Sequence, residues 1–508
     1  MLPKHSIFRN ALLLTAIDLL LRGISMSFQI YLSGVIGAAG LGLLQLVAAV
    51  GTLGMTLGLS GVRTAVMYLC AEEYGKRRPG GMRHVMRLCI LWSSVFSILT
   101  AAALWGFSDR LAAVWLKDLR AASGLRILAL SLPVECLVCV LCGYFTACGK
   151  LRRLACVEVA ERLVSLALTF LLLRLWAHSE LERACCSLLL GGGGAAVFSA
   201  VWLGLLMRKD FRQYPPVPQP PQLPRRLCRL CVPLALGDYL RSGLRTLEQL
   251  LIPLGLERSG GSTGSAMAAY GTIHAMVFPI LMFPAAIIFS LSELLIPELA
   301  RCRAEGNSRR ILHLTGRSLR LGPVFACGVS ALQFLLARPL GMLFYQSEEA
   351  GHYLRLFAPL IVILYADALV DGMCKGLGQQ TANVRNNTIT SLLDVALLYL
   401  LLPRLGIGGY FFTFVLTHAL NFYLSLRLLL DASGSVLPLG PLAKTALCAL
   451  ASAAACLLLP ERGPWLLQIF RTCGLFLAAY LPFLYLTGAL VPNDRRWLRR
   501  RFPHRNGH

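Results

Sequence analysis

Two stretches of this 508-residue chain place acidic and basic side chains inside otherwise apolar runs. The first stretch carries Asp18 and Arg22, four residues apart. The second carries four charges that fall within about 80° of one another on a helix and so form one polar stripe: Asp238, Arg241, Arg245 and Glu248. Ionisable side chains are costly at bilayer depth, where they mark polar pathways. We therefore interpret both stretches as the lining of a water-filled, mixed-charge cavity.

The arginines of this cavity suit a phosphate or diphosphate headgroup, because the guanidinium fork matches paired phosphate oxygens. The predicted substrate-binding residues are Arg22, Arg63, Arg241 and Arg245. The acids would hold these arginines in place or take up a coupling cation; they are Asp18, Asp238, Glu248, Glu161, Asp371 and Asp394. The alternative is a set of interhelical salt bridges, which are weak evidence for stability once desolvation is counted. Glu158 and Arg162 could close on each other in this way.

Other reactive side chains do not form a recognisable catalytic or metal site. The 17 cysteines include a CxxCxxC run (Cys136, Cys139, Cys142) and a CxxC pair (Cys228, Cys231), which we interpret as small buried hydrophobes. His274 and His418 are expected to be core residues. No nucleophile elbow or phosphate-binding P-loop is present, so we expect no catalytic residues, no metal and no cofactor. Transport would be driven by H⁺, Na⁺, the membrane potential or substrate flow.

The composition defines an all-α polytopic membrane protein, since 56% of residues are hydrophobic, 15% are charged and the mean hydropathy is +0.65. Runs long enough to span a bilayer predict about 14 transmembrane helices. They lie near 8–32, 41–69, 86–107, 123–148, 154–177, 184–207, 228–254, 266–299, 315–337, 353–374, 386–403, 407–430, 440–460 and 464–490.

The net charge of +24 is not arranged as a nucleic-acid surface. Basic residues concentrate in the even-numbered connections and the C-terminal tail, so the positive-inside rule places both termini in the cytoplasm.

The chain repeats itself on either side of a proline-rich stretch, Gln213–Pro224, which is predicted to be a semi-rigid linker. Ala39-Gly40-Leu41-Gly42 matches Ala268-Ala269-Tyr270-Gly271, and Gly143-x5-Gly149 matches Gly372-x5-Gly378, both at an offset of 229 residues. Six spans per repeat give two lobes of parallel orientation. We expect an N-terminal six-helix lobe (1–212), the linker (213–224), a C-terminal six-helix lobe (225–432), two additional transmembrane helices (433–492) and a basic cytoplasmic tail (493–508).

Several of these segments resemble a known family. Tyr31–Leu46 (YLSGVIGAAGLGLLQL), Ser60-Gly-Val, Ala71–Lys76 (AEEYGK) and Gly376-Leu-Gly378 with the span ending at Pro403 are similar to the stage V sporulation protein B branch of the polysaccharide-biosynthesis transporters. That branch is part of the multidrug/oligosaccharidyl-lipid/polysaccharide (MOP) exporter superfamily. The resemblance implies a MATE-like fold. It also implies flipping of an undecaprenyl-diphosphate-linked saccharide across the bacterial cytoplasmic membrane by rocking of two lobes, in cell-wall, polysaccharide or sporulation processes.

Within this resemblance, Arg22 matches a cavity arginine of the lipid II flippases, whereas a second arginine expected six residues later is Phe28. This departure speaks against lipid II as the cargo. We expect a monomer whose partners are membrane lipids and the undecaprenyl-linked saccharide, with no nucleic acid. The alternatives are a cation-coupled multidrug antiporter of the same fold, a membrane-embedded glycosyltransferase, which the short outer loops disfavour, and a scaffold without transport.

Overall fold

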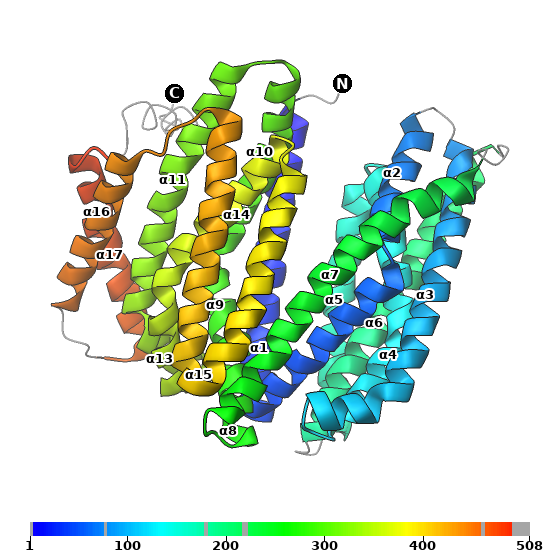
Figure 1. Ribbon diagram of the computed structural model, residues 1–508, viewed down its shortest axis with the longest axis horizontal. Helices are drawn as coiled ribbons and strands as arrows, with labels where there is room; N and C mark the ends of the chain where they lie inside the picture. Colours follow the sequence, from blue (N-terminus) through cyan, green and yellow to red (C-terminus); the bar gives the residue numbers. More distant parts are fainter. Residues whose placement is uncertain (1–3, 76–78, 177–180, 216–221, 459–462, 490–508) are drawn as a thin grey trace, which may run out of the picture. The chain divides into compact units, whose positions relative to one another are not determined.

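The computed structural model describes residues 4–75, 79–176, 181–215, 222–458 and 463–489, with side chains from residue 19 onward, and these residues form helices and no strands (Figure 1). The helices of the first half are α1 (Lys4–Leu59), α2 (Val62–Gly75), α3 (Met82–Arg110), α4 (Ala121–Ala147), α5 (Leu151–Trp176), α6 (Leu181–Gln213), α7 (Leu223–Arg258) and α8 (Thr263–Gly271). Those of the second half are α9 (Phe278–Met282), α10 (Ala285–Ala304), α11 (Ser308–Leu335), α12 (Ala337–Tyr345), α13 (Glu348–Phe357), α14 (Ile361–Gly376), α15 (Gln380–Ser433), α16 (Leu439–Leu457) and α17 (Trp465–Leu486).

The two longest helices each turn once inside, so each supplies two of the predicted spans. Gly37 interrupts α1 with a φ of 68°, and Gly406 interrupts α15 with a φ of 56°, a left-handed conformation that glycine adopts without a steric penalty. Within the described residues, ten helices, these two among them, are long and apolar enough to cross a membrane. The spans predicted over 154–177 and 228–254 fall on α5 and α7, which are helical but are not among these ten. The predicted fold class is confirmed, and the chain is a multi-pass membrane protein.

The predicted span over 266–299 is broken, as its three prolines led us to expect. After α8 the chain forms a π-helix, η3 (Thr272–Val277), then the short α9, and then α10. Pro279 lies at the start of α9, and Pro284 directly precedes α10. The position of the break is therefore set by the residues that cannot donate a backbone hydrogen bond.

The internal repeat is visible in the way α4 and α14 end. Gly149 and Gly378 both have a φ of 67°. Each lies in a C-cap where the following amide bonds back to the last turn, Lys150 N to Phe145 O (3.0 Å) and Gln379 N to Cys374 O (2.9 Å). All three pairs of equivalent positions are 229 residues apart. The two halves of the chain thus reproduce the same helix ending at the offset found in the sequence.

The chain divides into two compact units that do not follow the sequence in simple order. The first unit comprises Leu20–Gly271 and Val395–Gly409, and the second comprises Met1–Leu19, Thr272–Asp394 and Tyr410–His508. The predicted lobe boundary at 213–224 stays a prediction. Within that stretch Gln213 ends α6 and Leu223 begins α7, whereas residues 216–221 lie outside the described part of the chain, as do residues 490–508 of the tail.

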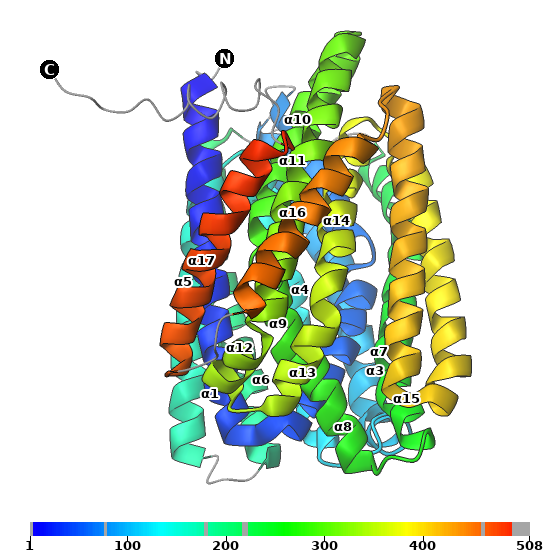
Figure 2. The same cartoon turned by 90° about the vertical axis from the view of Figure 1, so that its left-hand side faces the viewer.

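In the first unit, α4 and α5 pack against α6, α3 packs against α4, and α7 packs against α2. Its buried core contains Tyr144, Phe145, Met82 and Met86. In the second unit, α14 packs against α10 and α11, while α16 and α17 pack against each other and against α11 (Figures 1 and 2). A smaller core around Phe476 and Tyr480 binds α16 and α17 to α11.

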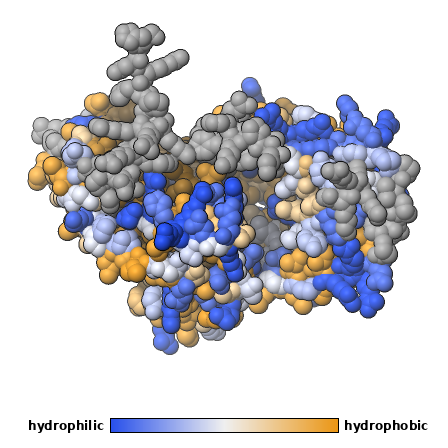
Figure 3. Space-filling model, turned by 90° about the horizontal axis from the view of Figure 1, so that it is seen from above, coloured by the Kyte–Doolittle hydropathy of each residue, from blue (hydrophilic) through white to orange (hydrophobic). Residues whose placement is uncertain are grey.

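The surface of the helices matches a lipid environment. Large apolar side chains are exposed along the lengths of α3, α5 and α6: Leu91, Ile98, Leu99, Phe170, Leu171, Val201 and Leu205. The face seen from above carries many hydrophilic residues (Figure 3). Exposed apolar surface of this extent is expected where acyl chains replace water.

One charged group at the end of a helix, Asp210, is buried and paired with two basic side chains. Asp210, at the end of α6, is 3% exposed and binds Lys150 (2.6 Å) and Arg153 (3.1 Å) from the α4–α5 turn. Burial on its own would lower the pKa of Lys150, but its hydrogen bonds to Asp210 and Tyr214 raise the pKa above its usual value. This predicted cytoplasmic connection is therefore held rigidly to the end of α6.

Candidate functional site

The charged stripe of α7 lies beside the face by which this helix packs in the first unit. On the packed face, the Tyr239 hydroxyl hydrogen-bonds with Ser60 and donates to the Leu57 carbonyl (3.4 Å), and the Thr246 hydroxyl donates to the Ala49 carbonyl (3.4 Å). Helical geometry turns the centre of the stripe roughly 130° away from these contacts. The packing that fixes α7 thus leaves the stripe open.

Two arginines and one acid of the stripe are without partners among the described residues. Arg241 and Arg245 are exposed and Asp238 is half-buried, and none of the three forms a hydrogen bond or ion pair with another described residue. Glu248 differs, because it is half-buried and interacts electrostatically with Tyr270 of α8. The salt-bridge alternative is therefore not realised by Arg241 and Arg245 within the described chain.

The other predicted residues of the first unit lie on different helices. Arg22 is half-buried on α1 and has an interaction partner, while Arg63 is exposed near the start of α2. The side chain of Asp18 lies outside the described residues. Arg63 interacts electrostatically with Glu158 of α5, and no ion pair joins Glu158 to Arg162 among the described residues.

Glu161 belongs to a second polar group inside the helices of the first unit. It accepts a hydrogen bond from the Ser199 hydroxyl of α6 (2.7 Å), and its charge interacts with that of Glu135 on α4. Glu135 in turn accepts from the Ser131 hydroxyl (2.8 Å). Glu135 was not predicted, although a single carboxylate in the otherwise apolar run SLPVECLVCVLCG was a signal that could have identified it.

In the second unit, the acids of α14 are held by amide side chains of α15. Asp371 forms an ion pair with Lys375 (2.5 Å) and accepts a hydrogen bond from the Asn383 amide, which in turn accepts from the Ser425 hydroxyl (3.0 Å). One turn earlier, Asp367 accepts from the Asn421 amide (3.1 Å).

Asp394 completes this group. It is 6% exposed and accepts from the Thr417 hydroxyl (2.7 Å), while Thr390 donates to the Asn421 side-chain oxygen (3.1 Å). We call this set the acid–amide network: Asp367, Asp371, Lys375, Asn383, Thr390, Asp394, Thr417, Asn421 and Ser425. Nearby, His274 hydrogen-bonds with Tyr410 (3.1 Å) and His418 stacks on Phe414, consistent with the predicted core role of both histidines.

The predicted site residues thus divide between two environments. Asp371 and Asp394 lie in the acid–amide network of the second unit, and the others with described side chains lie in the first unit. The cysteine runs remain free thiols, and no cluster of three or more metal-ligating side chains occurs within the described residues.

A helical chain of two repeats, with ionisable side chains set into apolar helices, defines the class of polytopic membrane transporters. The chain belongs to the MatE family, which matches residues 16–171 and 262–400. Stage V sporulation protein B of Bacillus subtilis (strain 168) is 22% identical over 419 residues, which cover 80% of each protein. The resemblance found in the sequence motifs is confirmed, and the protein is a MOP-superfamily transporter and not an enzyme.

Several solved structures share the fold, among them two transporters. The lipid II flippase MurJ in an inward closed conformation is 12% identical, covers 95% of this chain and 100% of its own, and has a TM-score of 0.71. An inward-facing multidrug resistance MATE family transporter of the MOP superfamily is 15% identical, covers 82% of this chain and 93% of its own, and has a TM-score of 0.61.

Proposed function

We propose that this protein is a flippase that moves an undecaprenyl-diphosphate-linked saccharide across the bacterial cytoplasmic membrane by alternating access, with both termini in the cytoplasm. The observation that carries the proposal is the pair Arg241 and Arg245, exposed near the middle of α7, a predicted membrane span, without a protein partner among the described residues. Asp238 and Glu248 on the same stripe moderate its positive charge.

An unpaired arginine at bilayer depth has a cost that a ligand can offset. Transferring one arginine to the centre of a membrane helix costs about 2.5–3.5 kcal/mol on insertion scales. Arg241 and Arg245 are one helical turn apart, about 6 Å along the axis, so each fork can bind one phosphate of a diphosphate. A lysine at either position would keep the charge and lose the paired hydrogen bonds.

The relatives support a lipid-linked cargo without defining it. The structure with the TM-score of 0.71 is that of a lipid II flippase, and the relative from Bacillus subtilis is a sporulation protein. Phe28 in place of an expected arginine favours a saccharide carrier other than a lipid II flippase.

The test is leaflet exposure of a labelled undecaprenyl-diphosphate saccharide in liposomes containing the purified protein. Arg241→Ala/Arg245→Ala should abolish flipping, and Arg241→Lys/Arg245→Lys should restore it only in part. Arg229→Ala is the matched control, because Arg229 is an exposed arginine at the predicted cytoplasmic end of the same helix. Full flipping by the alanine double variant would contradict the proposal.

A second candidate is a cation-coupled multidrug antiporter, and the acid–amide network is the observation that favours it. Carboxylates surrounded by amide and hydroxyl groups can exchange a proton or Na⁺ inside a transporter. If Asp371→Asn abolished dye efflux while the arginine variants remained active, the antiporter would replace the flippase.

A further inference from the structure

Two consecutive residues with a left-handed backbone separate α1 from α2, and they lie directly against α7. Ser60 has a φ of 45° and Gly61 has a φ of 72°. A Cβ on Gly61 would lie 2.7 Å from the Cys231 carbonyl oxygen and 2.9 Å from the Ala235 nitrogen, so glycine is needed for this close approach. Both segments belong to the first compact unit. The turn therefore packs backbone to backbone on one side of α7.

Ser60 needs support in this turn, because a residue with a side chain seldom adopts a left-handed conformation. Its hydroxyl donates to the Leu57 carbonyl (2.6 Å) and hydrogen-bonds with the Tyr239 hydroxyl of α7. The Tyr239 hydroxyl also donates to the Leu57 carbonyl (3.4 Å). Part of the support for the turn thus comes from α7.

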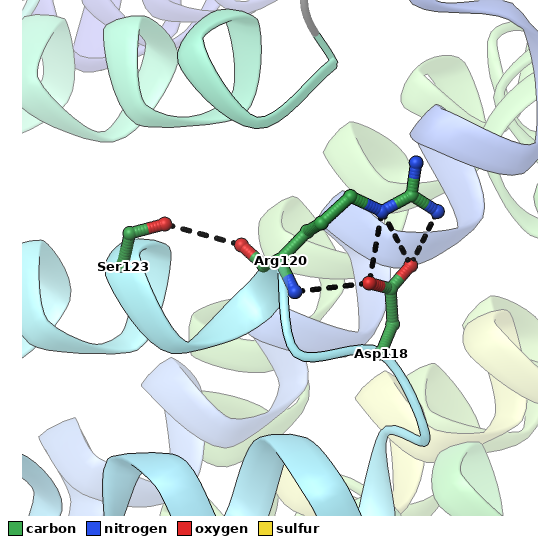
Figure 4. Close-up of polar contacts among 3 residues, drawn as sticks. All are labelled: Asp118, Arg120 and Ser123. Carbon is green, nitrogen blue, oxygen red and sulfur yellow. Dashed lines mark hydrogen bonds and ion pairs between the residues drawn. The ribbon is translucent and has the colours of Figure 1, made fainter.

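The turn between α3 and α4 shows how such a residue is held by local contacts (Figure 4). Lys117 has a φ of 51°, and Asp118 accepts from the Arg120 side chain (2.7 Å) and backbone amide (3.0 Å). The Ser123 hydroxyl donates to the Arg120 carbonyl (3.1 Å). These contacts are close in sequence, whereas Ser60 bonds with a side chain 179 residues further along the chain. The Ser60 turn and α7 therefore depend on each other.

The helix α7 needs such contacts because its apolar residues do not define a single buried face. Leucine and valine side chains occur on its exposed side and on its buried side: Val232, Leu236 and Leu240 are exposed, and Leu227, Leu244 and Leu250 are buried. A helix that is apolar on several sides gains little by burying one of them instead of another. The rotation of α7 about its own axis is then set by specific contacts.

These specific contacts share one side of α7. Gly61 packs on Cys231 and Ala235, the Tyr239 hydroxyl bonds with the α1–α2 turn, and the Thr246 hydroxyl donates to the Ala49 carbonyl (3.4 Å). The four positions on α7 lie within about 80° of one another around the helix. They hold this side of α7 against α1 and α2, so that the charged stripe faces away.

We propose that Tyr239, through the Ser60–Gly61 turn, fixes the rotation of α7 and is a positioning residue for Arg241 and Arg245. The inference rests on the headgroup site proposed above, and Tyr239 acts through the arginines instead of contacting the cargo. If α7 turned more freely, the arginines would be correctly placed for only a fraction of the time, and the apparent affinity would fall by that fraction. Saturating cargo would select the correct rotation, so the maximal rate of flipping would not change.

The first test compares binding of undecaprenyl diphosphate with flipping in the full-length Tyr239→Phe variant. The dissociation constant should rise about fivefold, which is the equilibrium factor of one net hydrogen bond, and the maximal flipping rate should equal that of wild type. Ser60→Ala removes the same hydrogen bond, so adding it to Tyr239→Phe should weaken binding little further. An unchanged dissociation constant in Tyr239→Phe would overturn the positioning role.

Tyr480→Phe is the matched control for this test. The Tyr480 hydroxyl donates to the Val324 carbonyl (2.8 Å) and joins α17 to α11 in the second unit, so its loss removes a hydrogen bond of the same kind away from the stripe. Binding of undecaprenyl diphosphate should be that of wild type. An equal rise of the dissociation constant in Tyr480→Phe would show that general destabilisation, and not the rotation of α7, weakens binding.

The second test uses two native thiols of α7 and needs no cargo. Cys231 is buried where Gly61 packs, whereas Cys228 is exposed on the same helix. In nanodiscs, N-ethylmaleimide should label Cys231 about fivefold faster in Tyr239→Phe than in wild type, while labelling of Cys228 stays constant, as read by peptide mass spectrometry. Gly243→Ala is the matched control, because its Cβ would meet nothing within 4 Å. Equal labelling of Cys231 in the two variants would overturn the inference.

Failure of this inference and failure of the flippase assignment give different results. If the flippase assignment is wrong, wild type does not bind undecaprenyl diphosphate, but the difference in Cys231 labelling persists. If the positioning role is wrong, wild type binds the diphosphate, but Tyr239→Phe changes neither its dissociation constant nor the labelling of Cys231.

Discussion

The stripe on α7 and the acid–amide network contain similar numbers of charges. The acids of the network are bound by protein side chains, whereas the two arginines of the stripe have no such partner among the described residues. In the network each acid is bound by a neighbouring side chain: Asp371 by Lys375 and Asn383, Asp367 by Asn421, and Asp394 by Thr417. On α7, Arg241 and Arg245 have no such partner within the described residues. A charged side chain that has a hydrogen-bond or ion-pair partner in the protein contributes to its structure. A charged side chain without such a partner is available to a ligand.

This difference separates two roles that the sequence assigned to one cavity. Both groups were predicted from the same signal, the cost of ionisable side chains in the bilayer. The network resembles a site that keeps its geometry while a small cation enters or leaves. The stripe resembles a site for a large anionic group that brings its own hydrogen-bond acceptors.

The largest expected effect on stability is that of Asn383→Ala. Asn383 is 2% exposed, donates to Asp371 and accepts from Ser425, so its removal leaves the buried Ser425 hydroxyl without its acceptor and Asp371 without its amide donor. We expect a loss of about 2–3 kcal/mol in the free energy of unfolding, measured by denaturant titration in detergent. Gln380→Ala, at the exposed start of the same helix, should have little effect. Equal losses in the two variants would show that the network is not structural.

Thr417→Val should have a smaller effect of the same kind. It removes the hydroxyl that donates to Asp394 and costs about 1–2 kcal/mol in the same titration. Thr388→Val is the control, because Thr388 donates only to the Val384 carbonyl of its own helix. If both substitutions were neutral, Asp394 would not depend on Thr417.

Arg241→Ala/Arg245→Ala should leave the free energy of unfolding within about 0.5 kcal/mol of wild type, because neither arginine has a hydrogen-bond or ion-pair partner among the described residues. This near-neutral result is what distinguishes the stripe from the network. A loss comparable with that of Asn383→Ala would mean that the arginines are structural and would remove the main support for a headgroup site.

The smallest effect is a dependence on pH where α7 meets α8. There Glu257, at the end of α7, forms an ion pair with Lys117 (2.6 Å) and accepts a hydrogen bond from the Thr263 hydroxyl of α8 (3.0 Å). The pKa of Glu257 is lowered in the folded protein, so the stability that its ion pair contributes is present above the ordinary glutamate value of 4.5 and is lost as the pH falls through the lowered value. The rate of amide hydrogen exchange in residues 263–271 should therefore be constant from pH 8 to pH 5 after correction for intrinsic rates. It should increase only below the ordinary pKa of glutamate. Lys117→Met should remove this dependence.

Much of the fold could be predicted from the sequence because the physical signals are strong over long windows. Apolar runs defined the spans, and Gly149 and Gly378 marked equivalent helix ends that the structure reproduces in detail. The stripe on α7 could be predicted because four charges on one helical face have no explanation in an apolar core.

The partners of the acids could not be predicted in the same way. Asn383, Asn421 and Thr417 are neutral, so they do not stand out in an amphipathic or charged pattern, and their importance comes from side chains up to 54 residues away in the chain. Glu135 carried a detectable signal, because it is the one carboxylate in an otherwise apolar run. The docking of α7 on α1 and α2 depends on tertiary packing around Gly61 and Tyr239, which no local pattern records.

The most direct test of the central claim is equilibrium binding of undecaprenyl diphosphate to the protein in nanodiscs, compared between Arg241→Ala/Arg245→Ala and Asp371→Asn. We predict that the arginine variant binds on the order of 100-fold more weakly, because two charge-assisted contacts are lost, and that Asp371→Asn binds as wild type does. The reverse pattern, with binding intact in the arginine variant and lost in Asp371→Asn, would contradict the account.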